Sequence, residues 1–142
     1  MGIIPPQIFL EFDCSEVTPG QTLAATGASA NLATVTLDVD ESDNVVWLTA
    51  YASWTLTGGV IGNRQVTFSI VRDDDEVICS GTDTSGPVGS WRMSALTCCD
   101  ENPGEGERTY TLVATAGTLG PAAQTVTFNN GTLTGSEIRQ NG

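Results

Sequence analysis

The chain has 142 residues and a net charge of −12, with 17 acidic residues, five basic residues and no histidine. The missing histidine excludes a Ser-His-Asp triad, a Cys-His dyad and a mixed Cys/His zinc site. A chain this acidic is a poor partner for nucleic acid or anionic membranes. The sequence also contains no run of about 18 apolar residues, the length that a membrane-spanning helix requires.

The first segment, residues 1–17, precedes a turn at Thr18-Pro19-Gly20 and is expected to form a separable N-terminal arm. It lacks a basic stretch followed by a clean apolar run, so we expect no recognisable signal peptide. Ile8–Phe12 is a short apolar strand candidate. Its apolar side chains are candidate contacts to another subunit: Ile8, Phe9, Leu10 and Phe12.

The strongest strand is predicted at Val45–Leu56, where every second residue from Val46 onward is apolar and faces the core. Shorter strands are expected at 33–39, 65–72, 76–80, 91–98, 108–116, 124–128 and 132–138. Loops are expected between them at 40–44, 73–75, 81–89 and 100–107. Residues 18–142 are therefore predicted to form an all-β, two-sheet sandwich of about eight to nine antiparallel strands. It is jelly-roll-like, with an immunoglobulin-like sandwich as the alternative.

Four cysteines are present, and the adjacent pair Cys98-Cys99 points to opposite faces of a strand. A Cys79–Cys98 bridge across a hairpin is plausible, which would leave Cys14 and Cys99. Cys14 would then bond to Cys99, or to Cys98, of another subunit. The alternative is that all four are free thiols or pair within the chain.

Acidic clusters at Asp38–Asp43 and Asp73–Glu76 could offer oxygen ligands to calcium. The positions of an EF-hand that require glycine and glutamate hold Asp43 and Thr49 when the loop starts at Asp38, so solvated turns are favoured and no metal site is predicted. Paired carboxylates also occur in glycosidases, but no aromatic cleft can be placed here. We expect no catalytic residues, no cofactor and no enzymatic activity.

The aromatic residues divide between the two faces of the predicted strands. Trp54, Phe68, Tyr110 and Phe128 fall on apolar faces and are expected in the core. Trp47 and Tyr51 fall on the opposite face of the strand that contains Trp54. They are candidates for a subunit contact, for burial within the chain, or for a sugar-binding shelf.

All five basic residues are arginine, so the chain has no lysine. Lysine on an edge strand commonly prevents that strand from pairing with another chain. The outward strand positions are instead rich in threonine and serine. Such uncharged faces favour edge-to-edge association, or docking of the N-terminal arm as an added strand. The outward positions are Thr34, Thr36, Thr67, Ser69, Thr109, Thr111, Thr125 and Thr127.

Three runs, Val46–Trp54, Gln65–Asp74 and Thr109–Gly117, resemble small β-rich proteins of the spore surface of spore-forming bacteria. These are exosporium proteins and, more loosely, subunits of endospore appendages, and the resemblance spans residues 33–138. It implies a jelly-roll sandwich that is assembled without a signal peptide. It also implies an N-terminal connector whose cysteine crosslinks neighbouring subunits, and Cys14 occupies a comparable place.

The favoured function is a structural subunit that assembles with copies of itself into an extracellular or spore-surface fibre or layer. Strand addition and intermolecular disulfides would join the copies. Two alternatives remain open: an adhesive or carbohydrate-binding module that uses Trp47 and Tyr51, and a virion or tail decoration protein.

Overall fold

The computed structural model describes residues 9–59, 63–120 and 123–139, which form nine strands and no helix. The strands are β1 (Phe9–Glu16), β2 (Thr22–Leu23), β3 (Ser29–Val39), β4 (Val45–Thr57), β5 (Gln65–Arg72), β6 (Val77–Thr84), β7 (Trp91–Asp100), β8 (Gly106–Ala116) and β9 (Thr125–Ile138). No helix that could cross a membrane occurs in these ranges.

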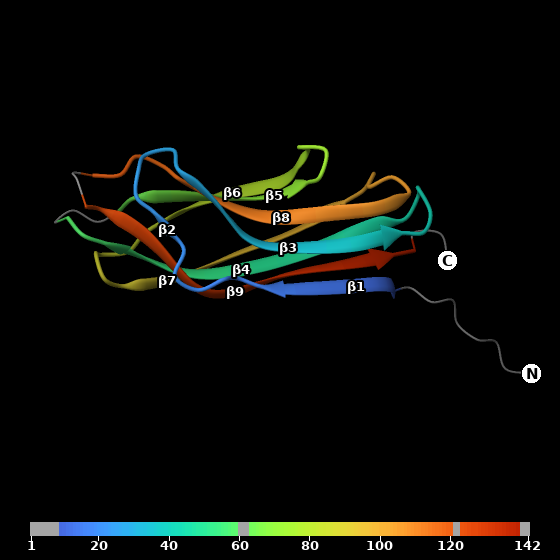
Figure 1. The fold of residues 1–142 in the computed structure, drawn as a ribbon, viewed down its shortest axis with the longest axis horizontal. Helices are drawn as coiled ribbons and strands as arrows, with labels where there is room; N and C mark the ends of the chain where they lie inside the picture. The colour runs from blue at the N-terminus through green and yellow to red at the C-terminus, as the bar shows by residue number, and fades with distance from the viewer. Residues whose placement is uncertain (1–8, 60–62, 121–122, 140–142) are drawn as a thin grey trace, which may run out of the picture.

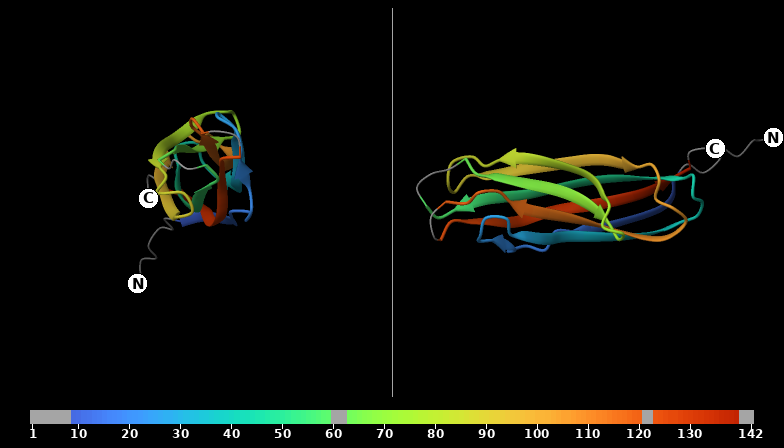
Figure 2. Two further views of the ribbon diagram at one scale, coloured as in Figure 1. Left: turned by 90° about the vertical axis from the view of Figure 1, so that its left-hand side faces the viewer. Right: turned by 90° about the horizontal axis from the view of Figure 1, so that it is seen from above.

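The strands lie in two stacked antiparallel sheets (Figures 1 and 2). The larger sheet has the order β1-β9-β4-β7, and the short β2 also pairs with β9. The smaller sheet has the order β3-β8-β5-β6. Residues 9–16, expected in the N-terminal arm, thus form an edge strand of the larger sheet, whereas Ile8 lies outside the described residues.

The pairing scheme identifies a jelly roll. The pairs β1·β9, β3·β8, β4·β7 and β5·β6 nest inside one another along the chain, as in one long antiparallel hairpin that has been rolled up. Only β5 and β6 are consecutive strands that pair with each other. The predicted jelly-roll-like sandwich is confirmed, and the immunoglobulin-like alternative does not fit, because that fold pairs consecutive strands in its first sheet.

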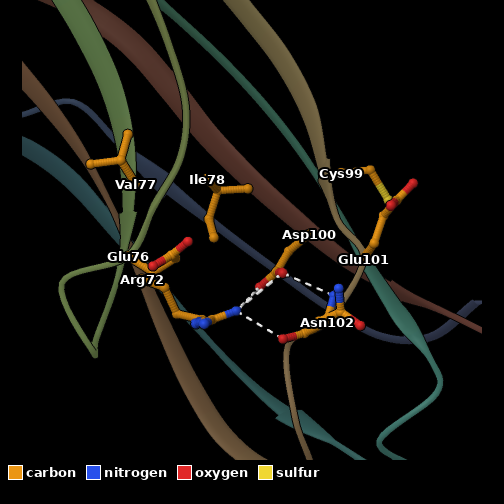
Figure 3. A pocket seen from close by; sticks show the side chains of 8 residues that line it. All are labelled: Arg72, Glu76, Val77, Ile78, Cys99, Asp100, Glu101 and Asn102. Carbon is orange, nitrogen blue, oxygen red and sulfur yellow. Dashed lines mark hydrogen bonds and ion pairs between the residues drawn. The ribbon is translucent and has the colours of Figure 1, made fainter.

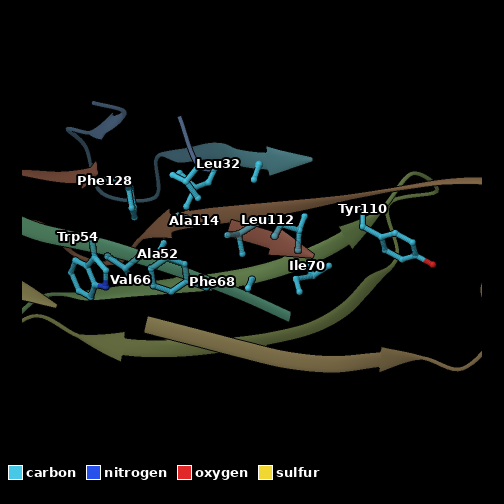
Figure 4. Close-up of a cluster of buried hydrophobic side chains, with 14 of the residues drawn as sticks. Leu32, Ala52, Trp54, Val66, Phe68, Ile70, Tyr110, Leu112, Ala114 and Phe128 are labelled. Carbon is cyan, nitrogen blue, oxygen red and sulfur yellow. The ribbon is translucent and has the colours of Figure 1, made fainter. Parts of the chain in front are cut away.

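The core lies between the sheets and follows the predicted alternation (Figure 4). Trp54, Phe68, Tyr110 and Phe128 are all buried, as expected. Phe68 of the smaller sheet contacts both Trp54 and Phe128 of the larger sheet, with ring centroids 6.2 and 6.1 Å apart. Such ring contacts contribute roughly 0.5–1.5 kcal/mol beyond area burial, so they help to hold the layers together.

Several predicted boundaries were wrong, and the strand predicted at 33–39 begins at Ser29. β6 continues through Thr84, because Gly81 and Thr82 pair with β5 instead of opening a loop. The two final segments are one strand, β9, which passes through Gly131. A Cβ at Gly131 would collide with the backbone of β4 at Tyr51 and Ala52, so glycine permits this close approach.

Candidate functional site

The side of the larger sheet that faces away from the core carries an unusual set of side chains, and we call it the outer face. One cross-strand row contains Phe12, Ser136, Trp47 and Cys99 from β1, β9, β4 and β7. Directly opposed residues in an antiparallel sheet share a face, so these four side chains lie on the same side. The next rows along the face contain Cys14, Thr134, Thr49 and Thr97, then Glu16, Thr132, Tyr51 and Ala95.

Large hydrophobic side chains are concentrated on this outer face. Among the described residues, six are exposed: Phe12, Trp47, Tyr51, Val77, Trp91 and Met93. All except Val77 belong to the outer face, since Trp91 and Met93 alternate in phase with Cys99 along β7. Apolar clusters of this kind on a protein surface mark interaction sites.

The predicted pair Trp47 and Tyr51 lies on the outer face, with 45% and 36% of each residue exposed. The alternative that both are buried within the chain was therefore wrong. Phe12 is 64% exposed, whereas Leu10 is half-buried. Phe9 lies in β1 opposite Ile138.

The outer face is also almost uncharged. In the three rows above, Glu16 is the one residue with a charged side chain. The acidic clusters lie instead in loops, at 40–43 and 73–76. A second copy that approaches through this face meets few charged side chains directly, while the net charge of −12 acts between any two copies at longer range.

The structure confirms the Cys79–Cys98 disulfide, with a Cα–Cα distance of 6.3 Å. It does not cross a hairpin, because β6 and β7 are edge strands of different sheets. The bond therefore joins the two layers along one side of the sandwich. Closing a loop of this length contributes about 3 kcal/mol to stability in the chain-entropy model.

The other two cysteines, Cys14 and Cys99, are free and exposed. They lie on β1 and β7, the two edges of the larger sheet, so three strand spacings of about 4.8 Å place them at least about 14 Å apart. Disulfides require Cα atoms within about 7 Å, so these two cannot bond within one chain. Cys98 is occupied by Cys79, which removes it as the alternative partner of Cys14. Burial, with smaller effects from Glu101 and Asp100, raises the pKa of Cys99.

A hollow of about 250 Å³ beside Cys99 holds an ion-pair network (Figure 3). Asp100, which is buried, accepts hydrogen bonds from Arg72 at 2.9 Å and from the Tyr110 hydroxyl at 2.7 Å. The pKa of Tyr110 is raised mainly by burial and, to a smaller extent, by its hydrogen bond to Asp100. Arg72 also binds Asp74 and lowers the pKa of that carboxyl to about 2. These polar groups satisfy one another and tie β5, β7 and β8 together, which is a structural role.

Most of the outward threonine and serine residues lie on central strands, where they cannot support edge-to-edge association. Thr109, Thr111, Thr125 and Thr127 lie on β8 and β9, which are central strands. On the edge strand β3, the backbone N–H groups of Thr36 and Asp38 donate to the side chains of Asp13 and Glu11 on β1. The protein thus covers this edge with its own carboxylates, which disfavours strand addition there.

No family model matches the sequence, and no curated protein matches it. Solved structures share the fold. The VP2 subviral particle of infectious bursal disease virus aligns with a TM-score of 0.59 and 12% identity over 89% of this chain and 32% of that chain. The structure of the Gx strain of that virus aligns with a TM-score of 0.59 and 11% identity, over 100% of this chain and 38% of that chain.

The Eiger TNF protein from S. frugiperda aligns with a TM-score of 0.56 and 10% identity, over 96% of both chains. The chain therefore spans about a third of the viral capsid chains and nearly all of the TNF protein. At these identities the likeness establishes the fold, a jelly-roll β-sandwich of the kind found in viral capsid and TNF-like proteins.

Proposed function

We propose that the protein is a structural subunit that assembles with copies of itself through the outer face of the larger sheet. The observation that carries this proposal is the concentration on one nearly uncharged face of Phe12, Trp47, Tyr51, Trp91, Met93 and both free cysteines. The occupant that fits best is a second copy, because its own outer face is equally apolar and equally free of the acidic loops.

Disulfides between copies would lock this contact. In a two-fold symmetric pair, if Cys14 of one copy meets Cys99 of the other, the reverse contact forms as well. Each bond joins two thiols, which lose two protons and two electrons to an oxidant such as a small-molecule disulfide, itself reduced to two thiols. If the contact is instead head-to-tail, the same bonds propagate a filament.

The setting we propose is an extracellular or spore surface, and it is supported by the resemblance of the strands at 46–54, 65–74 and 109–117 to spore-surface proteins. The viral neighbours support a virion or decoration protein as the alternative, since they form subviral and T=1 particles. Both settings use a jelly roll that packs against copies of itself, so the contact face is the shared and testable element.

The test is the mass of the native protein in solution, measured by light scattering across a concentration series. We expect wild-type protein to form oligomers or filaments and the double variant W47S/Y51S to be monomeric, because polar side chains weaken an apolar contact. V77S is the matched control, since Val77 is an exposed apolar residue outside the outer face. A monomeric wild type, or equal assembly of all three proteins, would overturn the proposal. Glycan-array binding by a monomeric wild type, lost in W47A, would identify the sugar-binding module instead.

The crosslink is tested by non-reducing gels. C14S and C99S should each lose the covalent dimer, and a mixture of the two should regain it, because one supplies Cys99 and the other Cys14. A dimer that persists in C99S would show that Cys14 bonds to itself. A monomer band in oxidised wild-type protein, unchanged in C14S, would remove crosslinking from the proposal altogether.

A further inference from the structure

Three carboxylates from distant parts of the chain meet at one end of the sandwich. Glu11 lies on β1, Asp40 follows the end of β3, and Glu137 lies near the end of β9. One carboxylate oxygen from each lies within 4.8 Å of the others. Figure 1 shows why: the start of β1, the end of β9 and the loop after β3 lie together at the right-hand end of the sandwich in that view.

Glu137 is the member of this cluster whose environment is incomplete. It is fully buried, and its Oε2 accepts hydrogen bonds from the backbone N–H of Asp40 at 2.7 Å and from the amide of Asn44 at 2.9 Å. Its Oε1 is buried and has no hydrogen-bond partner. A buried carboxylate oxygen without a partner costs free energy, because it has given up its water and gained nothing in exchange.

The charge of the cluster is also uncompensated. None of the ion pairs formed by the described residues includes Glu11, Asp40 or Glu137. Glu11 and Glu137 are directly opposed across the β1·β9 pair, an arrangement that destabilises a sheet when both carry the same charge. One positive ion among the three carboxylates would offset their mutual repulsion. It would also give the unpartnered oxygen of Glu137 a cation to bind.

We propose that Glu11, Asp40 and Glu137 form a binding site for a divalent cation, and that the ion is Ca²⁺. Calcium takes six to eight oxygen ligands at about 2.3–2.6 Å, so oxygens on opposite sides of it are about 4.6–5.2 Å apart. The three oxygens of this cluster lie within 4.8 Å of one another, so all of them can reach a single ion of this size. Mg²⁺ requires shorter bonds in a nearly ideal octahedron, which a site built from three separate segments supplies less readily.

The bound ion would link segments of both sheets. β1 and β9 belong to the larger sheet, whereas Asp40 directly follows β3 of the smaller sheet. Because the ion binds only where all three segments meet, it stabilises the folded protein by ligand linkage. It also fastens β1, the strand that carries Phe12 and Cys14, onto the body of the sandwich.

The test is calorimetric titration of chelator-treated full-length protein with CaCl₂. We expect one saturable site per chain, with a dissociation constant of roughly millimolar or tighter, and weaker binding of MgCl₂. D40N should weaken calcium binding at least about tenfold, in line with changes around other metal sites. E41Q is the matched control, because it removes one charge from the same exposed loop without removing a proposed ligand.

Asp40 is exposed, so D40N is expected to fold, and its circular dichroism spectrum checks this. At the same concentration, calcium should also raise the melting temperature of wild type and E41Q more than that of D40N. The proposal is overturned if no saturable binding occurs up to millimolar calcium, or if folded D40N binds calcium as tightly as E41Q does. Equal affinity for Mg²⁺ would overturn the assignment to calcium.

Discussion

The outer surfaces of the two sheets differ in chemistry although both are built from long alternating strands. On the smaller sheet, outward hydroxyls pair across strands, as in Thr36–Thr109 at 3.1 Å and Thr67–Thr82 at 2.8 Å. The larger sheet also has one such pair, Thr57–Thr125 at 2.6 Å, but its outer face additionally carries Trp47, Tyr51 and Cys99, which the chain leaves exposed. A surface whose polar groups are already paired gains little from a partner, whereas exposed aromatic rings gain from being covered. The difference therefore indicates which face assembles.

The largest expected effect comes from placing one carboxylate at the middle of each outer surface. W47E, on the central strand β4, should weaken self-association at least about 30-fold, the loss expected for a central apolar contact worth roughly 2 kcal/mol. T111E, on the central strand β8 of the smaller sheet, should associate like wild type. Sedimentation velocity measures both, and reversal of the two results would assign assembly to the smaller sheet.

Cys98 and Cys99 are adjacent in sequence, but we expect the first to affect the stability of the fold and the second to affect assembly. Removal of the sheet-to-sheet bond in C79S/C98S should lower the free energy of unfolding by about 2–5 kcal/mol, because the unfolded chain gains freedom. C99S, on the outer face, should change it by less than about 0.5 kcal/mol. Urea denaturation measures both. A large loss in C99S would mean that this thiol contributes to the fold of a single chain.

The threonine pairs are expected to contribute modestly. T111V removes the hydroxyl that lies 3.3 Å from that of Thr34, so it should lower stability by about 0.5 kcal/mol, the low end for an exposed hydrogen bond. T34V/T111V should be no worse than the single variant, since neither hydroxyl is then left unpaired. The measurement is again urea denaturation. Loss of assembly in either variant would show that the smaller sheet takes part in the contact between copies.

The smallest effect concerns the reactivity of Cys99. Its pKa is raised by burial and by Glu101 and Asp100, so less thiolate is present at neutral pH than for an ordinary thiol. In C14S, kept dilute enough to be monomeric, iodoacetamide should modify Cys99 more slowly than free cysteine and faster as the pH rises. E101Q should increase the rate at neutral pH slightly. A rate above that of free cysteine would contradict the direction of the pKa shift.

Sequence alternation predicted the layers well but not how they connect. The period-two pattern of β4 placed Val46, Leu48 and Trp54 in the core, and all three are buried. It could not assign strands to sheets, because each strand of a sandwich has one inward face whichever layer it joins. The Cys79–Cys98 pair was therefore predicted correctly but placed across a hairpin that does not exist.

The candidate sites were also predictable from the sequence only in part, because strand pairing was unknown. Trp47 and Tyr51 could be assigned to the face opposite Trp54 from their phase along the strand, whereas Phe12 was predicted only as one of four apolar contacts in the N-terminal segment. Trp91 and Met93 were not assigned to a face, since they join the outer face only once β7 is paired with β4. The cluster of Glu11, Asp40 and Glu137 was missed because its members are far apart in sequence, and a search for calcium ligands within one loop examines only Asp40 and its neighbours.

The central claim is that a second copy covers the outer face of the larger sheet. The most direct test is hydroxyl-radical footprinting of wild-type protein, read by mass spectrometry, in assembled and in dissociated samples. Assembly should protect Phe12, Trp47 and Met93 from oxidation and leave Val77 unchanged. Equal oxidation of Trp47 and Met93 in both samples, or protection confined to the smaller sheet, would contradict the account.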